Sequence, residues 1–180
     1  MKKPFSARRL SFIALGSALI TVCAWISIPA AVPFTLQTFA VFTVTCVLGW
    51  RDAALSVMVY LFLGGVGVPV FSGFSGGPGA LFGATGGYLL GFIAIPLLRA
   101  PAGKNARLPM EALALIAGLA VCYAFGTAWF VRVYSRRSAI TVGKALSLCV
   151  VPFILPDLMK LTLSLAVGRR VREALRLAAA

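Results

Sequence analysis

Residues 64–91 read GGVGVPVFSGFSGGPGALFGATGGYLLG, and this stretch decides what fold the rest of the chain can adopt. It holds eleven of the 18 glycines, carries no charge, and lies between two apolar runs. Glycine and proline at this density break regular helix, which leaves backbone N–H and C=O groups without intrahelical partners. In a hydrocarbon environment these groups must pack against protein or line a polar cavity. We therefore expect either a binding site or a tight helix connection here, and composition alone does not separate the two.

The overall composition is that of a membrane protein. The chain has 180 residues, is 61% hydrophobic and has a mean hydropathy of +0.99, whereas soluble domains are about 45–50% apolar. The net charge of +13 could suggest nucleic-acid binding, but the basic residues lie at the edges of apolar runs. That placement is typical of cytoplasmic loops, so we expect a lipid bilayer as partner and no nucleic acid.

Cysteine and histidine usage argues against a metal site or a disulfide framework. The chain has no histidine, and no two of its four cysteines have zinc-finger or CxxC spacing. Each cysteine lies alone in an apolar stretch and is expected to be a small buried hydrophobe; the four are Cys23, Cys46, Cys122 and Cys149. We predict no metal and no cofactor.

The hydrophobic pattern predicts an all-α membrane protein, a six-transmembrane-helix bundle forming one integral membrane domain over residues 1–180. The expected spans are residues 10–28, 36–50, 53–63, 85–98, 110–131 and a last helix near residue 156. The N-terminus looks like a signal peptide, but no clear small-residue cleavage site follows, so we interpret it as the first span. Residues 50–52 form a short charged turn, and the glycine-rich stretch is the outer loop between the third and fourth helices.

The last span can be placed in two ways. Either residues 145–168 form one broken helix, or the sixth helix begins near Pro156 and extends past the bilayer. Proline suits a first helical turn, where its missing N–H is not needed, and this favours the second version.

The basic residues indicate an orientation with both termini in the cytoplasm. Six spans with an inner N-terminus place twelve bases inside and four outside, in line with the positive-inside rule. The inner set is Lys2, Lys3, Arg8, Arg9, Arg51, Arg99, Lys104, Arg107, Arg169, Arg170, Arg172 and Arg176; the outer set is Arg132, Arg136, Arg137 and Lys144. The outer basic loop has no explanation in the sequence.

Asp157 and Lys160 are the leading candidates for a functional pair. Residues three apart share a helix face, so the two side chains can meet. Ionisable groups at membrane depth usually mark a substrate or ion pathway. Alternatively, Asp157 only caps a helix that starts at Pro156, and Lys160 extends to the interface.

Two further patterns suggest contacts. Aromatic residues alternate with glycine in residues 64–91, which suits a neutral, partly apolar ring compound; they are Phe71, Phe74, Phe82 and Tyr88. The stretch lacks the lysine of a phosphate-binding loop. In the first span, Ala14 and Ala18 are small residues four apart, a spacing that lets another helix approach closely.

Three long motifs resemble the BioY family. They are PFTLQTFAVF (residues 33–42), GVPVFSGFSGGPGALFGATGGYLLGF (residues 67–92) and PFILPDLMKL (residues 152–161), in the family's order and spacing. The resemblance runs from about Trp25 to the last helix and is weakest in residues 100–144. The family often has P-G-D where Leu155, Pro156 and Asp157 stand, a departure that keeps the aspartate and the lysine.

The resemblance implies a biotin-binding S component of an energy-coupling-factor (ECF) transporter, a six-helix bundle that captures biotin at the outer face of the bacterial cytoplasmic membrane. By resemblance, Ala14 and Ala18 contact the transmembrane coupling subunit, which two ATPase subunits drive. Asp157 is expected to accept a ureido N–H of biotin, while Lys160 keeps the carboxylate ionised. The remaining expected contacts are Phe71, Phe74 and Tyr88 around the ring, Gly76 and Gly77 through their backbone, and Thr35 and Gln37 in a gating loop.

Other functions stay open at this point. The chain could transport biotin without the ATPase module, or bind another vitamin. An intramembrane enzyme using Asp157 would need a second carboxylate or a nucleophile–base pair. Asp52 and Glu111 fall at the predicted cytoplasmic ends and the chain has no histidine, so no catalytic residue is assigned. A scaffold without a ligand would leave the charged pair and the aromatic glycine stretch unexplained.

Overall fold

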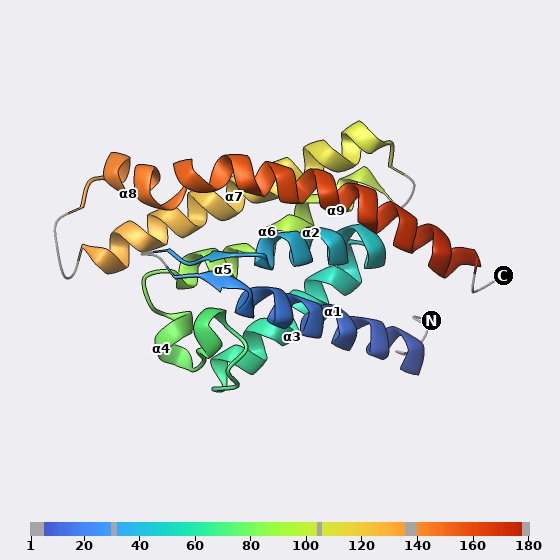
Figure 1. Cartoon of the computed structure of the whole chain (residues 1–180), viewed down its shortest axis with the longest axis horizontal. Coiled ribbons are helices and arrows are strands. Elements are labelled where there is room, and N and C mark those ends of the chain that lie inside the picture. Colours follow the sequence, from blue (N-terminus) through green and yellow to red (C-terminus); the bar gives the residue numbers. More distant parts are fainter. Residues whose placement is uncertain (1–5, 30–31, 104–105, 136–139, 178–180) are drawn as a thin grey trace.

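The computed structural model describes residues 6–29, 32–103, 106–135 and 140–177, and it is a helical bundle (Figure 1). Lys2, Lys3, Lys104, Arg136 and Arg137, which entered the charge pattern, lie outside the described residues. In chain order the elements are α1 (Ala7–Trp25), β1 (Ser27–Ile28), β2 (Phe34–Thr35), α2 (Gln37–Leu48), α3 (Trp50–Gly65), η1 (Ser72–Phe74), α4 (Pro78–Leu81), α5 (Gly86–Gly91), α6 (Ala94–Leu98), η2 (Ala100–Ala102), α7 (Leu108–Tyr134), α8 (Val142–Cys149) and α9 (Val151–Leu177).

Three of the described helices are long and apolar enough to cross a membrane: α1, α7 and residues 151–175 of α9. The expected span at residues 110–131 lies within α7, and the expected first span corresponds to α1. The second and third spans correspond to α2 and α3, which have 12 and 16 residues. The chain is thus mostly helical, and six membrane crossings stay a prediction.

One predicted boundary between helices was wrong. The charged turn expected at residues 50–52 is the first turn of α3, and the chain bends one residue earlier, at Gly49, whose φ of 80° suits glycine. The expected fourth span, residues 85–98, lies within a short apolar helical segment that begins at Gly86, in which Phe92 and Ile93 separate α5 from α6. Pro96 in α6 has no N–H to donate, which weakens the helix there.

The start of the last helix also differs from the preferred prediction. The helix α9 begins at Val151, because the backbone of Val150 leaves the helical conformation at the end of α8. The Val150 carbonyl then accepts the N–H groups of Phe153 and Ile154 at 2.9 and 3.2 Å, in the first turn of α9. Pro156 therefore lies inside α9. Asp157 is not in the first turn, so the helix-start explanation for its position does not hold.

The middle of the glycine-rich stretch, residues 66–85, is a compact, mostly irregular segment between α3 and α5, which we call the glycine-rich segment. It contains only η1 and the four-residue α4, with a bridge between Phe71 and Ser75. Gly64 lets this segment close onto the bundle, because a Cβ at Gly64 would collide with the ring of Phe71. Phe71 is consequently buried at 2% exposure. The segment therefore packs tightly against the bundle, and it also lines the cavity of the candidate site.

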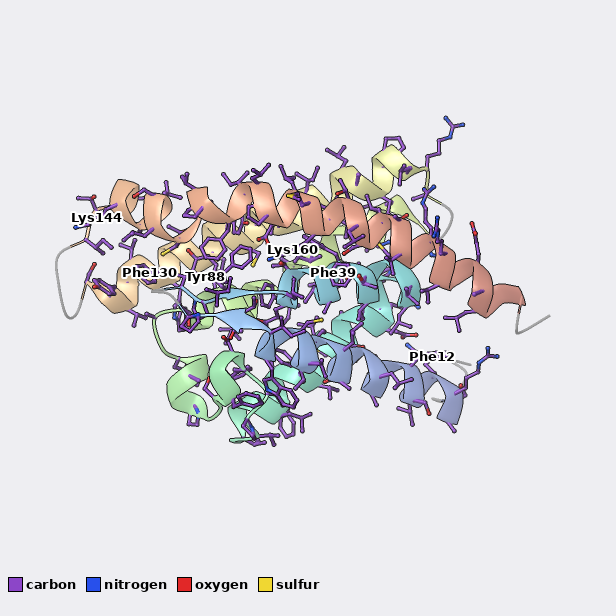
Figure 2. All side chains as sticks on the ribbon, in the orientation of Figure 1. Phe12, Phe39, Tyr88, Phe130, Lys144 and Lys160 are labelled. Carbon is purple, nitrogen blue, oxygen red and sulfur yellow. The ribbon has the colours of Figure 1, made fainter. Side chains whose placement is uncertain are left out.

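The bundle is built on pairs of packed helices, α2 with α9, α1 with α3, and α7 with α5 and α6. The start of α1 and the end of α9 lie at one end of the bundle, and α4 and α8 lie at the other (Figure 1). Figure 2 shows Lys160 in the middle of the molecule's length and Lys144 near the α8 end. The four cysteines are buried and free, as predicted.

One face of α9 packs against α2 from Lys160 to Gly168. The Ser164 hydroxyl donates to the carbonyl of Phe39 at 3.0 Å and accepts from Thr43 at 3.2 Å. At Gly168, a Cβ would lie 2.6 Å from the Cβ of Cys46, so only glycine allows this approach. Four residues spaced four positions apart lie on this side of α9, and we call them the α9 seam: Lys160, Ser164, Gly168 and Arg172.

Candidate functional site

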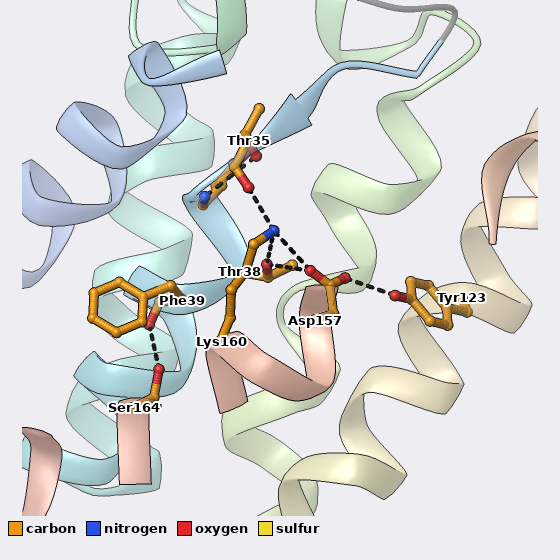
Figure 3. A network of polar contacts seen from close by, with 8 residues as sticks. Thr35, Thr38, Phe39, Tyr123, Asp157, Lys160 and Ser164 are labelled. Carbon is orange, nitrogen blue, oxygen red and sulfur yellow. Dashed lines mark hydrogen bonds and ion pairs between the residues drawn. The ribbon is translucent and has the colours of Figure 1, made fainter. Parts of the chain in front are cut away.

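Asp157 and Lys160 form the predicted pair on α9. The Lys160 Nζ lies 2.8 Å from the Asp157 Oδ1, one turn along the helix. Both residues are buried, with 2% and 8% exposure. The expectation that the two side chains meet is confirmed (Figure 3).

Further hydrogen bonds satisfy both charges. The hydroxyl of Thr38 donates to the Asp157 Oδ1 at 2.8 Å, and the hydroxyl of Tyr123 donates to the Oδ2 at 2.6 Å. The Lys160 ammonium also donates to the carbonyl of Thr35 at 2.7 Å and to Thr38 at 3.2 Å, and it lies 4.3 Å from the ring centre of Phe34. Buried charges are tolerated when they are paired and hydrogen-bonded in this way.

The network borders a cavity of about 310 Å³, a size within the range of small-molecule sites. Its walls come from residues 32–38, the glycine-rich segment, α5, α7 and the first turns of α9. Six of the sequence-predicted site residues line it: Thr35, Gln37, Phe71, Tyr88, Asp157 and Lys160. The lining is otherwise mainly apolar, and in the described part of the chain its only charged residues are Asp157 and Lys160.

Three of the predicted contact residues are not among the cavity-lining residues. Phe74 is 65% exposed and stacks on Trp25 with ring centres 5.0 Å apart. Gly76 lies so close to the carbonyl of Val68 that a Cβ would collide with it. Gly77 has a φ of 89°, and its N–H donates to the carbonyl of Gly64 at 2.7 Å. These residues shape the glycine-rich segment and do not reach the cavity.

Tyr88 and Phe71 owe their positions to neighbours that leave room for them. The Tyr88 hydroxyl lies 2.9 Å from the Thr127 hydroxyl, and Gly126 accommodates its ring, since a Cβ there would enter it. Phe71 meets the ring of Tyr60 edge-on, with centroids 5.4 Å apart. The two aromatic side chains therefore present fixed surfaces to the cavity.

Sequence reasoning missed two residues of the network, Thr38 and Tyr123. Thr38 follows Gln37 in the first of the three motifs, but nothing in the pattern shows that it faces Asp157 across 119 positions. Tyr123 is an ordinary aromatic residue within an apolar span. Its only signal is a hydroxyl at membrane depth, which needs a partner when buried.

Ala14 and Ala18 lie on the outer face of α1 and are exposed. Their neighbours Gly16 and Ser17 face inward, and a Cβ at Gly16 would lie 2.6 Å from the hydroxyl oxygen of Ser56 on α3. Within the described chain, the inward residues of this motif make the α1–α3 contact. The outward pair is left available to another molecule.

No group of three or more histidine, cysteine or acidic side chains that could hold a metal is found among the described residues.

A model of the BioY family matches residues 1–177. The chain belongs to the BioY family. The resemblance carried by the three motifs is thereby confirmed.

Relatives within the BioY family cover nearly the whole chain. The "Biotin transporter BioY" of Thermotoga maritima is 42% identical over 92% of this chain and 96% of its own length. The "Biotin transporter BioY" of Rhodobacter capsulatus is 31% identical over 92% of this chain and 94% of its own length. These BioY relatives are named as transporters.

A solved structure shares the fold of this BioY chain. It is the S component for biotin from an ECF-type ABC transporter, with a TM-score of 0.79 over 96% of this chain and 95% of that chain, at 24% identity. The helical bundle described above is therefore an S-component fold.

Proposed function

We propose that this BioY chain binds biotin in the cavity beside Asp157 and carries it across the bacterial cytoplasmic membrane as an S component, with no catalytic step. The observation that carries the proposal is the buried Asp157–Lys160 pair facing a mainly apolar cavity of about 310 Å³. The names of the relatives and of the structural neighbour support it. A hydrolase using Asp157 would need a second carboxylate or a nucleophile–base pair, and Asp157 is the one carboxylate that lines this cavity in the described chain.

The chemistry of biotin fits the network. Its ureido ring offers two N–H donors and one carbonyl, and a carboxylate is a strong acceptor for such donors. An ionised carboxylate accepts about four hydrogen bonds, and Asp157 accepts three from the protein. We assign the remaining capacity to the ureido group. Lys160, which pairs with Asp157, would donate to the ureido carbonyl or the valerate.

The apolar part of biotin would lie against Phe71 and Tyr88, with Thr35 and Gln37 at the wall formed by residues 32–38. Gating by this wall follows from the family resemblance. Phe74, Gly76 and Gly77 act indirectly, by holding the glycine-rich segment in the shape that places Phe71.

The proposed orientation puts both termini in the cytoplasm, which agrees with the start of α1 and the end of α9 lying at the same end of the bundle (Figure 1). Ala14 and Ala18 would contact the coupling subunit, which in turn binds two ATPase subunits. The alternative is a solitary transporter that needs no module.

We expect Ala14→Trp and Ala18→Trp to abolish co-purification with the coupling subunit and to reduce ATP-dependent biotin uptake at least tenfold. The physical reason is that an indole at either position prevents close helix approach. Biotin binding by the isolated protein should not change. Ala166→Trp, at an exposed alanine on α9, is the matched control. Uptake that persists in cells lacking any coupling subunit would favour the solitary transporter.

The proposed substrate is tested by calorimetry on detergent-purified protein with biotin, riboflavin and thiamine. We expect saturable binding of biotin alone, because only the cyclic urea pairs its N–H groups with Asp157 in so small a cavity. A biotin derivative methylated on both ureido nitrogens should bind at least tenfold more weakly. Tighter binding of another vitamin by folded protein would contradict the assignment of biotin.

A further inference from the structure

A second cavity lies at the end of the bundle opposite α4 and α8, and the proposed function does not use it. Its volume is about 750 Å³. It is formed where α1 begins, α2 gives way to α3, α6 ends and α9 approaches its C-terminus. The charged residues of its lining are Arg9, Arg51, Asp52, Arg99 and Arg172.

The cavity carries an excess of positive charge. Four arginines and one aspartate line it, and the aspartate, Asp52, is held by Arg9 at 2.6 Å. Behind the lining, buried Glu111 accepts from Arg99 and from Arg172, each at 2.8 Å. Counting both acids, the four arginines keep two uncompensated charges.

One of the arginines keeps its donors for a further partner. The exposed Arg51 makes no ion pair within the described chain, and its guanidinium lies 5.0 Å from the ring centre of Trp50. Its N–H groups are therefore available to an acceptor brought into the cavity.

The start of α3 adds a second favourable feature. Gly49, Trp50, Arg51 and Asp52 all line the cavity, and no side chain caps this helix. The first N–H groups of a helix lack intrahelical partners, and together with the helix dipole they favour an anion. The carboxylate of Asp52 is already engaged by Arg9.

We infer that this cavity binds the phosphate of an anionic phospholipid headgroup. Arg9 and Arg172 lie near the ends of α1 and α9, which are long and apolar enough to cross a membrane. Charged residues at the ends of such spans are expected at the depth of lipid headgroups. Exposed apolar side chains next to them, Leu10 beside Arg9 and Val171 beside Arg172, offer a surface for acyl chains. Basic pockets between helices at a cytoplasmic face bind such headgroups.

Trp50 provides a direct probe of occupancy. The chain has three tryptophans, and Trp25 and Trp129 contact the glycine-rich segment at Pro69 and Gly83. In a Trp25→Phe/Trp129→Phe background, quenching of Trp50 by brominated phosphatidylglycerol in competition with phosphatidylcholine measures headgroup preference in bilayers. We expect a clear preference for phosphatidylglycerol, and Arg51→Gln should reduce it about fivefold, since each basic residue near a membrane surface contributes about a fivefold factor.

Arg132→Gln, an exposed arginine at the far end of α7, is the matched control and should leave the preference unchanged. Arg51 is exposed and takes no part in the buried ion pairs, so the Arg51→Gln protein should fold. Biotin binding by the Arg51→Gln protein, measured beside the wild type, checks that it is folded. If the double-phenylalanine background does not fold, native mass spectrometry of the wild-type and Arg51→Gln proteins measures retained phosphatidylglycerol. Three results would overturn the inference. They are equal quenching by the two lipids, an equal loss of phosphatidylglycerol preference in Arg51→Gln and Arg132→Gln, and displacement of the lipid by millimolar inorganic phosphate.

Discussion

Asp157→Asn is expected to weaken biotin binding about 100-fold. A hydrogen bond to a charged acceptor contributes roughly 1.5–3 kcal/mol, which corresponds to about 10- to 150-fold in affinity. The substitution also leaves the Lys160 ammonium without its counter-ion, 2.8 Å away in the native protein. The lysine then competes with the ligand for the remaining acceptors. Isothermal calorimetry on purified protein measures the change.

The control for this variant is Asp52→Asn, which removes a carboxylate paired with Arg9 at the end of the bundle where α1 begins. Its biotin affinity should equal that of the wild type. Because Asp157→Asn strands Lys160, a double variant, Asp157→Asn/Lys160→Met, separates folding from binding. We expect the double variant to recover thermal stability but not biotin affinity. Unchanged affinity in Asp157→Asn would rule out the ureido–carboxylate contact.

Glu111→Gln is expected to produce the largest loss of stability. Glu111 is fully buried, and its Oε1 accepts from Arg99 Nε and Nη2 at 3.2 and 2.8 Å and from Arg172 Nη2 at 2.8 Å. Removing one partner of a buried ionic cluster typically costs about 3–5 kcal/mol, because the remaining charges stay buried without compensation. For a chain of this size we expect the unfolding temperature to fall by roughly 10 °C. Thermal unfolding in detergent, followed by circular dichroism, measures it.

The half-exposed pair of Arg9 and Asp52 is the comparison for that loss. Its side chains are 35% and 24% exposed, and such pairs contribute about 1 kcal/mol or less. Asp52→Asn should therefore lower the unfolding temperature by only about 3 °C. Equal losses in the two variants would show that Glu111 is solvated in the folded protein and does not hold the two arginines together.

The sequence predicted the parts of the site that depend on local spacing. Asp157 and Lys160 are three residues apart, and helical geometry brings them together wherever the helix begins. For the glycine-rich stretch, the sequence predicted either a binding site or a tight helix connection, because unpaired backbone groups are too costly in hydrocarbon. Neither inference needs any knowledge of how distant helices pack.

What the sequence did not predict depends on three-dimensional packing. Thr38 and Tyr123 reach Asp157 from α2 and α7, and no periodicity relates the three positions. Phe74 resembles Phe71 in sequence, yet its φ of 55° turns it outward onto Trp25. Gly49 ends α2 before the charged residues that marked the expected turn, because a single glycine in a left-handed conformation is enough to end a helix.

The α9 seam restricts how the protein can change shape. Lys160, Ser164 and Gly168 engage α2 through charge, hydroxyl and close backbone contact in turn, and Arg172 engages α7. A rotation of α9 by one residue, about 100°, would break all of these contacts together. We therefore expect α2 and α9 to move as one rigid body, so that Asp157 and Lys160 keep their places in the cavity wall when a ligand enters or leaves.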